Sequence, residues 1–455
     1  MSDTIAAIAT GGVVAAIGIL RVSGDDTMQI IDKVFKPISG KPMSSYPNRQ
    51  LVYGSMVDAD GTELDICLCT ISRGPGSYTG EDTAELQTHG SPVVLRAGLE
   101  ALFAAGARQA KAGEFSKRAF LNGRMDLTQA EAVIDIIHSE TAEAAKNAVG
   151  QLNGAILRKT DGIYASLVEI CSHYHAVLDY PDEDIEDFRL ENYSSVLDDA
   201  ITQLQRLMNT FNRGRIMTEG VKAAIIGKPN AGKSSLLNAL LGYERAIVTD
   251  IAGTTRDTIE ERVRMGNVLI RLTDTAGIRQ TDDTVEKIGV DRALSAAQNA
   301  DLVIAVFDGS AELTEEDYNA IEAAAACEKS IAVVNKSDLQ QVVTADALAD
   351  KFSIVCVLSA KQQTGLEELE AAVAELFPTP DAPVGEILTN ARHADAVGRA
   401  LESLRAAKDA MLMGITPDAV LTEAEEAMAA LGELTGKTIR EDVTNRIFSR
   451  FCVGK

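Results

Sequence analysis

The chain has 455 residues, the length of about three domains of roughly 150 residues each, which excludes a single small module. Hydrophobic residues make up 46% of the chain and charged residues 24%, so the composition is that of a folded chain rather than a disordered or collagen-like one. A formal net charge of −24 disfavours a surface that wraps nucleic acid over its whole extent, although it is compatible with a local basic patch.

Cysteine usage and the first segment bear on where the chain works. The 6 cysteines are scattered and lack C-x-x-C spacing, so we expect reduced thiols in a cytoplasmic protein rather than a disulfide framework or a zinc site. The uncharged stretch 5–20 is too short to span a bilayer, and no basic residue precedes it. We therefore interpret it as a buried strand and predict no membrane partner.

Residues 1–117 mix short strand patterns with turn clusters. Strands are predicted at 17–22 and 64–71, an ordered loop at 74–80, and a helix at 93–105. This segment is therefore predicted to be an α+β domain.

Two helical segments, 118–214 and 379–455, flank an α/β segment at 215–378. Apolar residues recur every three or four positions in both flanks, which is typical of amphipathic helices. We predict that the flanks pack together as one discontinuous α-helical domain into which the α/β segment is inserted. The acidic run Pro181–Asp184 interrupts the first flank and is interpreted as a solvated turn.

The inserted segment alternates strands rich in Val, Ile and Ala with helical stretches. This alternation is typical of a doubly wound parallel sheet. The predicted strands are 221–226, 268–273, 302–307, 331–335 and 354–358.

The first polar motif of this segment, Gly227–Ser234, fits G-x-x-x-x-G-K-S between a predicted strand and a predicted helix, which is the context that a phosphate-binding loop needs. Its glycines let backbone N–H groups close around phosphates, and the helix N-terminus adds a favourable dipole. Lys233 is expected to reach the β- and γ-phosphates, and the Ser234 hydroxyl to ligate Mg²⁺.

Three further motifs follow strands in the order that a GTPase requires. Asp274–Gly277 lies where a carboxylate near Mg²⁺ and an N–H that senses the γ-phosphate belong. In Asn335–Asp338, the Asp338 carboxylate can accept hydrogen bonds from guanine N1–H and the 2-amino group, a pair of donors that adenine lacks. Ser359–Lys361 is expected to contact guanine O6 through backbone N–H groups. Together the motifs predict GTP binding.

The segment Gly253–Asp257 lies where a switch supplies a Thr hydroxyl to Mg²⁺, and Thr255 is predicted for that role. Ile278 stands after Asp274–Gly277 where small GTPases have the glutamine that orients water, so hydrolysis is expected to use another group. Asn230 could ligate a cation between the phosphates, where positive charge would stabilise the transition state. The candidates for the group that assists hydrolysis in place of glutamine are therefore Glu286, Arg256, Arg279 and such a monovalent cation.

Taken in order, these motifs and both ends of the chain resemble the MnmE (TrmE) family of tRNA-modification GTPases. The resemblance runs over the whole chain, and the terminal Cys452–Lys455 is its most specific mark. The segments that carry it are 20–24, 79–82, 113–122, 227–235, 249–257, 274–277, 335–338 and 451–455.

The resemblance implies an N-terminal domain (1–117) that dimerises and binds 5-formyltetrahydrofolate, a helical domain in two parts (118–214 and 379–455), and an inserted Ras-like P-loop GTPase domain (215–378). It implies a homodimer that works with the flavoprotein MnmG (GidA). Together they would modify C5 of the wobble uridine in certain tRNAs to carboxymethylaminomethyl or aminomethyl derivatives. In the family, GTP hydrolysis depends on K⁺ and on dimerisation of the G domains.

Site residues follow from the resemblance position by position. The K⁺ ligands are Asn230, Thr249, Ile251 and Thr254, and Glu286 positions the attacking water indirectly. The folate contacts are Arg21, Glu85, Arg124 and Lys455, and Cys452 acts near the folate and tRNA chemistry. The expected GTP contacts are Asn230, Ala231, Gly232, Lys233, Ser234, Ser235, Thr249, Asp250, Ile251, Ala252, Gly253, Thr254, Thr255, Asp274, Thr275, Ala276, Gly277, Asn335, Lys336, Ser337, Asp338, Ser359, Ala360 and Lys361.

Alternatives stay open at this point. Two stretches dense in basic residues, 108–124 and 437–455, would suit tRNA or an anionic ligand, or they are solvated helix faces. Arg21 with Glu85 could be a structural ion pair, and Cys452 an idle tail thiol. The whole chain could instead be a GTP-dependent ribosome-assembly or RNA-binding switch, although neither a second G domain nor an RNA-binding KH module is evident in the sequence.

Overall fold

A computed structural model describes residues 3–11, 13–180, 188–243, 261–272, 297–378, 382–437, 444, 447–449 and 451–454. The chain divides into two compact units. The first comprises Met1–Ile134, Gln151–Glu191 and Asp409–Lys455, and the second comprises Asp135–Gly150 and Asn192–Lys408. Each unit is therefore assembled from segments that are far apart in the sequence.

The first unit contains a 7-stranded sheet with the order β3-β4-β5-β6-β2-β1-β7. Its pairings are antiparallel except that between β1 and β7, which is parallel. The stretch 5–20, predicted as one buried strand, holds β1 and the first part of β2, and β1 forms an antiparallel pair with the end of β2, Leu20–Ser23. The strands are β1 (Ile5–Ile8), β2 (Ala15–Ser23), β3 (Phe35–Pro37), β4 (Val52–Val57), β5 (Glu63–Ser72), β6 (Thr83–Gly90) and β7 (Arg108–Gln109).

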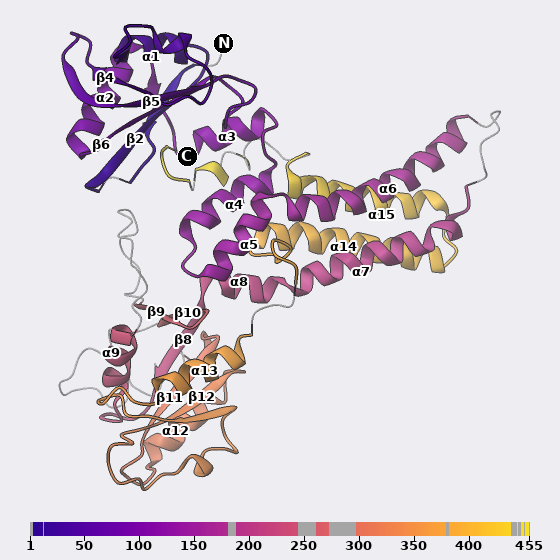
Figure 1. Ribbon diagram of the computed structural model, residues 1–455. Coiled ribbons are helices and arrows are strands. Elements are labelled where there is room, and N and C mark those ends of the chain that lie inside the picture. The colour runs from indigo at the N-terminus through magenta and orange to yellow at the C-terminus, as the bar shows by residue number, and fades with distance from the viewer. Residues whose placement is uncertain are drawn as a thin grey trace. The chain divides into compact units, whose positions relative to one another are not determined.

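Two helices, α1 (Thr27–Val34) and α2 (Pro92–Ala105), cover one face of this sheet (Figure 1). Side chains alternate along the strands, so Leu20 and Leu86 point to the helices and are fully buried. The opposite face carries Ile17, Tyr53 and Ile66, which are 60%, 53% and 44% exposed. The sheet thus has one face packed by two helices and an opposite face on which these three apolar side chains are exposed, while Phe115 packs on that face at Ile5 and Ala7 of β1.

Helices and an aromatic cluster complete the first unit. Helix α6 (Ala155–Asp179) packs against α15 (Pro417–Thr435), and the two lie side by side in Figure 1. This contact joins the segments before and after the α/β segment, as predicted for a discontinuous helical domain. Near the C-terminus, Phe448 and Phe451 pack on Leu127 and Ala130 of α4 (Leu127–His138).

The second unit contains a 6-stranded sheet with the order β13-β12-β11-β8-β10-β9. All neighbours are parallel except β9 and β10. The five strands predicted from the sequence are confirmed, and β9 is an additional antiparallel edge strand. The strands are β8 (Val221–Ile226), β9 (Glu261–Met265), β10 (Val268–Leu272), β11 (Leu302–Asp308), β12 (Ser330–Asn335) and β13 (Ile354–Val357).

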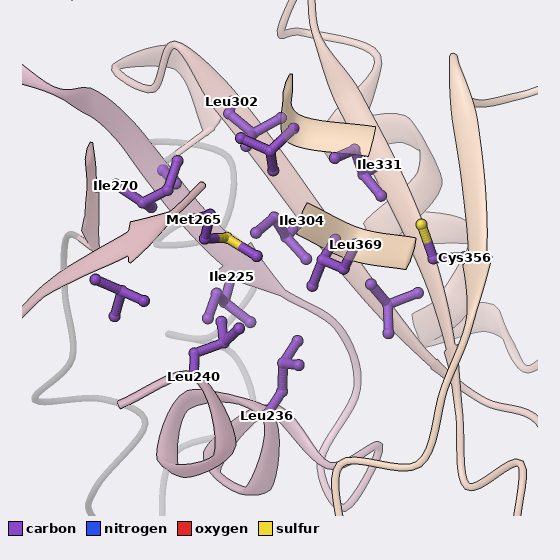
Figure 2. Close-up of a cluster of buried hydrophobic side chains, with 14 of the residues drawn as sticks. Ile225, Leu236, Leu240, Met265, Ile270, Leu302, Ile304, Ile331, Cys356 and Leu369 are labelled. Carbon is purple, nitrogen blue, oxygen red and sulfur yellow. The ribbon is translucent and has the colours of Figure 1, made fainter. Parts of the chain in front are cut away.

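Helices cover both faces of this sheet, which explains why its strands are continuous apolar runs. On one face, Ile225, Ile304 and Ile331 pack with Leu236 of α9 (Lys233–Tyr243) and with Leu369 of α13 (Leu366–Leu376) (Figure 2). On the other face, Ile226 and Phe307 pack with Ala320 of α12 (Glu315–Ala324). Because the central strands are parallel, the loops that follow them gather at one edge of the sheet.

The remaining helices are α3 (Glu114–Leu121), α5 (Ala142–Leu152), α7 (Ser194–Asn209), α8 (Phe211–Glu219) and α14 (Ala391–Leu412), with short 3₁₀ turns at Met43–Ser45, Leu190–Tyr193 and Ala345–Ala347. In the second unit, Lys408 of α14 bonds to Ser194 and Asp198 of α7. Within the described ranges, every helix falls short of the length and apolarity that crossing a membrane demands.

Candidate functional site

The phosphate-binding loop predicted at Gly227–Ser234 connects β8 to α9. Its backbone takes left-handed conformations at Gly227 (φ +143°), Asn230 (φ +60°) and Gly232 (φ +102°). A Cβ atom built on Gly227 would lie 2.3 Å from the carbonyl oxygen of Val306, and one on Gly232 would lie 2.0 Å from Asn335 Nδ2. Both glycines are therefore required by close approach as well as by φ.

Lys233 begins α9 and its side chain closes the loop. Its Nζ atom donates hydrogen bonds to the carbonyl oxygens of Gly227 (2.7 Å) and Lys228 (2.8 Å). Burial lowers the pKa of Lys233 from its usual value. The ammonium thus lies beside the backbone of the loop at the N-terminus of α9. This combination of a positive charge and a helix N-terminus is suited to binding a phosphate.

Asn335, the last residue of β12, joins three loops at this edge of the sheet. Its Nδ2 atom donates to the Ala231 carbonyl oxygen at 2.9 Å, and its Oδ1 atom accepts from the Ala360 N–H at 3.0 Å. Ser359 Oγ donates to Asp338 Oδ1 at 2.7 Å. The structure therefore brings together the phosphate loop and the two predicted guanine motifs, although Ala231 and Asn335 lie 104 positions apart in the chain.

Sequence reasoning missed Asp308, which supports the guanine motif. Lys336 has φ +66°, and its Nζ atom donates to Asp308 Oδ2 at 2.6 Å. Burial tends to raise the pKa of Asp308, but hydrogen bonds from Lys336 and Ser310 outweigh it and lower the pKa below its usual value. The available signal was an acidic residue at the end of a buried strand.

The switch residues lie outside the described ranges. They are Thr249, Asp250, Ile251, Ala252, Gly253, Thr254, Thr255, Asp274, Thr275, Ala276, Gly277 and Glu286, together with Lys455 at the C-terminus. Of the remaining predicted GTP contacts, Asn230, Ser235, Ser337, Asp338 and Lys361 are exposed. Among the described residues, no group of three or more His, Cys, Asp or Glu side chains could hold a metal ion.

A second site lies on the open face of the first unit's sheet. Arg21 and Glu85 are cross-strand partners on β2 and β6, and Arg21 Nε lies 2.9 Å from Glu85 Oε1. The guanidinium also lies over the rings of Tyr78 and Phe115, at 5.6 and 5.7 Å from their centroids. Arg124 is exposed and lies beside Gly80 of the same loop as Tyr78.

The C-terminal residues reach this second site. Arg21 Nη1 donates to the Gly454 carbonyl oxygen at 3.3 Å, and Gly113 N donates to the Cys452 carbonyl oxygen at 3.3 Å. Val453 forms a β-bridge with Ala112. Cys452 itself is exposed. Three predicted folate residues and the predicted reactive cysteine therefore belong to one neighbourhood.

The basic stretch 108–124 is less available than its sequence indicates. Arg118 bonds to Asp3, Glu81 and Glu114, and its side chain is only 10% exposed. Arg108 bonds to Asp3 and Glu114. Two of the basic residues are thus neutralised within the fold, so this stretch offers less positive surface than the number of its basic residues suggests.

Comparisons with known proteins agree over the whole chain. The family model described as "GTP-binding protein TrmE N-terminus" matches residues 4–124, and that of the "MnmE helical domain" matches residues 127–452. The tRNA modification GTPase MnmE of Thermoanaerobacter pseudethanolicus is 43% identical, with 100% of this chain and 99% of the relative covered. That of Clostridioides difficile is 41% identical, with 100% of both covered.

A solved structure, the G domain of the T. maritima FeoB iron transporter, matches 34% of this chain and 97% of its own length at 31% identity, with a TM-score of 0.26. The assignment rests on the full-length relatives and on the two family models, which together span both units. This chain belongs to the MnmE (TrmE) family of tRNA modification GTPases.

Proposed function

We propose that this GTPase binds GTP in the loops that follow β8, β12 and β13. The observation that supports this most strongly is Asn335, whose amide bonds hold the phosphate loop and the Ala360 backbone in one arrangement. Lys233 would contact the β- and γ-phosphates, and backbone N–H groups of Asn230–Ser235 would surround them.

Guanine would be selected by Asp338, which would accept hydrogen bonds from N1–H and the 2-amino group. Ser359 Oγ donates to one carboxylate oxygen of Asp338, which orients the carboxylate while each of its oxygens keeps a lone pair for the base. Replacing the carboxylate by an amide should weaken GTP binding and improve binding of xanthosine triphosphate, whose C2 carbonyl can accept from the amide. Equal preference of Asp338→Asn and the wild type for GTP would overturn this role.

Hydrolysis would use residues of the phosphate loop together with residues outside the described ranges. Ser234 and Thr255 would hold Mg²⁺, which supplies positive charge beside the β- and γ-phosphates. Asn230, Thr249, Ile251 and Thr254 would hold K⁺, and Glu286 would position water through an intermediary. Rates compared in K⁺ and Na⁺ test the cation, since equal rates would exclude it. A Glu286→Ala variant that hydrolyses GTP normally would remove Glu286 from the mechanism.

A one-carbon donor of the 5-formyltetrahydrofolate type would bind at Arg21, Glu85, Arg124 and Lys455. The Tyr78 and Phe115 rings beside Arg21 suit a flat heterocycle, and Glu85 could accept from its N–H donors. Cys452 would act near this ligand. Calorimetric titration of 5-formyltetrahydrofolate into Glu85→Gln should show weaker binding than into the wild type, whereas Glu100→Gln, on the exposed side of α2, should bind normally.

The chain would work as a homodimer through the open sheet face of its N-terminal domain, because exposed Ile17, Tyr53 and Ile66 form an apolar surface there. Light scattering after size-exclusion chromatography should show that Ile17→Asp with Ile66→Asp converts a dimer to a monomer. Exposed Ile38, changed to Asp, is the matched control. A dimer that survives the double substitution would refute this interface.

The biological output would be modification of C5 of the wobble uridine in certain tRNAs, in the cytoplasm and together with MnmG. The domains would be 1–117, 118–214 with 379–455, and 215–378. Mass spectrometry of tRNA nucleosides from cells with and without the gene tests this proposal. Loss of carboxymethylaminomethyl and aminomethyl uridines in the deletion would support it. An unchanged profile with a ribosomal-subunit defect would favour an assembly role instead.

A further inference from the structure

The phosphate loop carries a second lysine, Lys228, which bonds to a helix rather than to the loop. Its Nζ atom lies 2.7 Å from Asp317 Oδ2 of α12. The Lys228 side chain is 13% exposed and that of Asp317 is fully buried. A buried ion pair of this kind constrains both partners strongly, because each charge is costly to bury without the other.

Asp317 is itself fixed by the start of α12. Its Oδ2 atom also accepts hydrogen bonds from Thr314 N and Thr314 Oγ1, both at 2.8 Å, in a reciprocal capping arrangement. Its Oδ1 atom is buried and has no hydrogen-bond partner among the described residues. The carboxylate therefore depends on Lys228 for charge compensation and cannot rotate without breaking the cap.

Lys228 is held at both ends. Its carbonyl oxygen accepts a hydrogen bond from Lys233 Nζ at 2.8 Å, while its side chain is tied to α12. Helix α12 packs on the sheet through the buried Ala320, Ala323 and Ala324. The chain of contacts therefore runs from the rigid sheet core through Asp317 and Lys228 to the ammonium expected to contact phosphate.

We propose that Lys228 and Asp317 are positioning residues that hold the phosphate loop in the shape required to bind the β- and γ-phosphates of GTP. This inference rests on the proposed nucleotide site. The pair would act through the loop backbone and Lys233, without touching the nucleotide. Its loss should therefore weaken binding of di- and triphosphates while sparing contacts to guanine and ribose.

The test measures the affinities of GMP, GDP and a non-hydrolysable GTP analogue for full-length Lys228→Met, Asp317→Asn and the double variant. We expect each single change to weaken GDP and GTP-analogue binding about 10-fold and GMP binding by less than about twofold. The double variant should bind GDP and the GTP analogue with no lower affinity than the single variant that binds them less tightly, because both changes remove the same interaction. Lys228→Met leaves the Thr314 cap intact, so it remains informative if Asp317→Asn fails to fold.

Asp301→Asn is the matched control. Asp301 likewise accepts a hydrogen bond from a backbone N–H, that of Lys222, and forms an ion pair with Arg215. These contacts lie at the start of β8, whereas the phosphate loop follows its end. Asp301→Asn should change no nucleotide affinity. Equal losses of GMP and GDP affinity in the Lys228 variant, additive effects in the double variant, or a lowered melting temperature with normal GDP binding would each overturn the positioning role.

A further variant separates this inference from the proposed nucleotide site. If Lys233→Ala binds GDP as tightly as the wild type, the proposed site is wrong. If Lys233→Ala loses GDP binding while Lys228→Met retains it, the site stands and only the positioning role fails.

Discussion

Glu114 is expected to provide acid-sensitive stability to the first unit. It accepts hydrogen bonds from Arg108 Nη1 (2.9 Å), the Lys111 backbone N–H (2.8 Å) and Arg118 Nη2 (3.3 Å). Burial raises the pKa of this carboxyl, but the hydrogen bonds and charges of its neighbours outweigh burial and lower the pKa from 4.5 to about 2.

The pKa shift sets the size and the sign of the effect. A carboxyl whose pKa falls from 4.5 to about 2 on folding stabilises the folded state by about 3 kcal/mol at neutral pH. The contribution is complete above the unfolded pKa, because the carboxylate is then ionised in both states. As the pH falls through 4.5 toward 2, the unfolded chain binds the proton first, so about 1 kcal/mol is lost by roughly pH 4.

The perturbation is Glu114→Gln, which keeps the shape of the side chain and removes its charge. Hydrogen exchange of the amides of α3 and β1, followed across urea titrations, reports the free energy of unfolding of this unit apart from the GTPase segment. We expect a loss of about 3 kcal/mol at pH 7 and about 2 kcal/mol at pH 4, and no loss for exposed Glu100→Gln. A penalty that is absent at pH 7, or that does not shrink on acidification, would refute the reasoning.

Three other expectations concern the thiols, a tight helix contact and the nucleotide site. Cys452 should be the only fast-reacting thiol toward a disulfide reagent, and Cys452→Ser should abolish the fast phase, because it is exposed while burial raises the pKa of Cys67 to about 12. Gly214→Ala should destabilise the second unit by about 2 kcal/mol or more in urea titrations, since its Cβ would lie 2.0 Å from the Leu388 carbonyl oxygen; Gly398→Ala, with open space around it, should stabilise by about 0.5–1 kcal/mol. Asn335→Ala leaves two buried backbone groups without its amide and should weaken GTP binding about 30-fold in fluorescence titrations, and near-normal affinity would exclude its bridging role.

The sequence predicted best what depends on local pattern. The parallel strands of the second unit were recognisable because each is an apolar run buried on both faces, and the phosphate loop because its glycines have fixed spacing. Strand β9 was missed because only Val263 and Met265 of its five residues are buried, as befits an edge strand. A short polar run of this kind resembles a loop.

Partnerships between distant residues could not be predicted. Charge counting treated Arg108 and Arg118 as available surface, yet Asp3, more than a hundred positions away, neutralises both. Asp308 and Asp317 likewise gain their importance from lysines that folding brings beside them. Their neighbouring residues contain no sign of this, because an ion pair is a property of the tertiary structure.

The return of the C-terminal residues to the first unit has a consequence for biogenesis. A Cβ on Gly454 would lie 2.4 Å from the Ile8 carbonyl oxygen, so the C-terminal residues fit closely against β1. The Arg21 guanidinium donates a hydrogen bond to the Gly454 carbonyl oxygen. On a translating ribosome, the second unit can fold once residue 408 has emerged, whereas the first unit lacks its last segment until Asp409–Lys455 has emerged as well. Emergence of Gly454, rather than of the N-terminal sheet, would then complete the Arg21 site, and nascent chains that still lack this residue would carry an unfinished one.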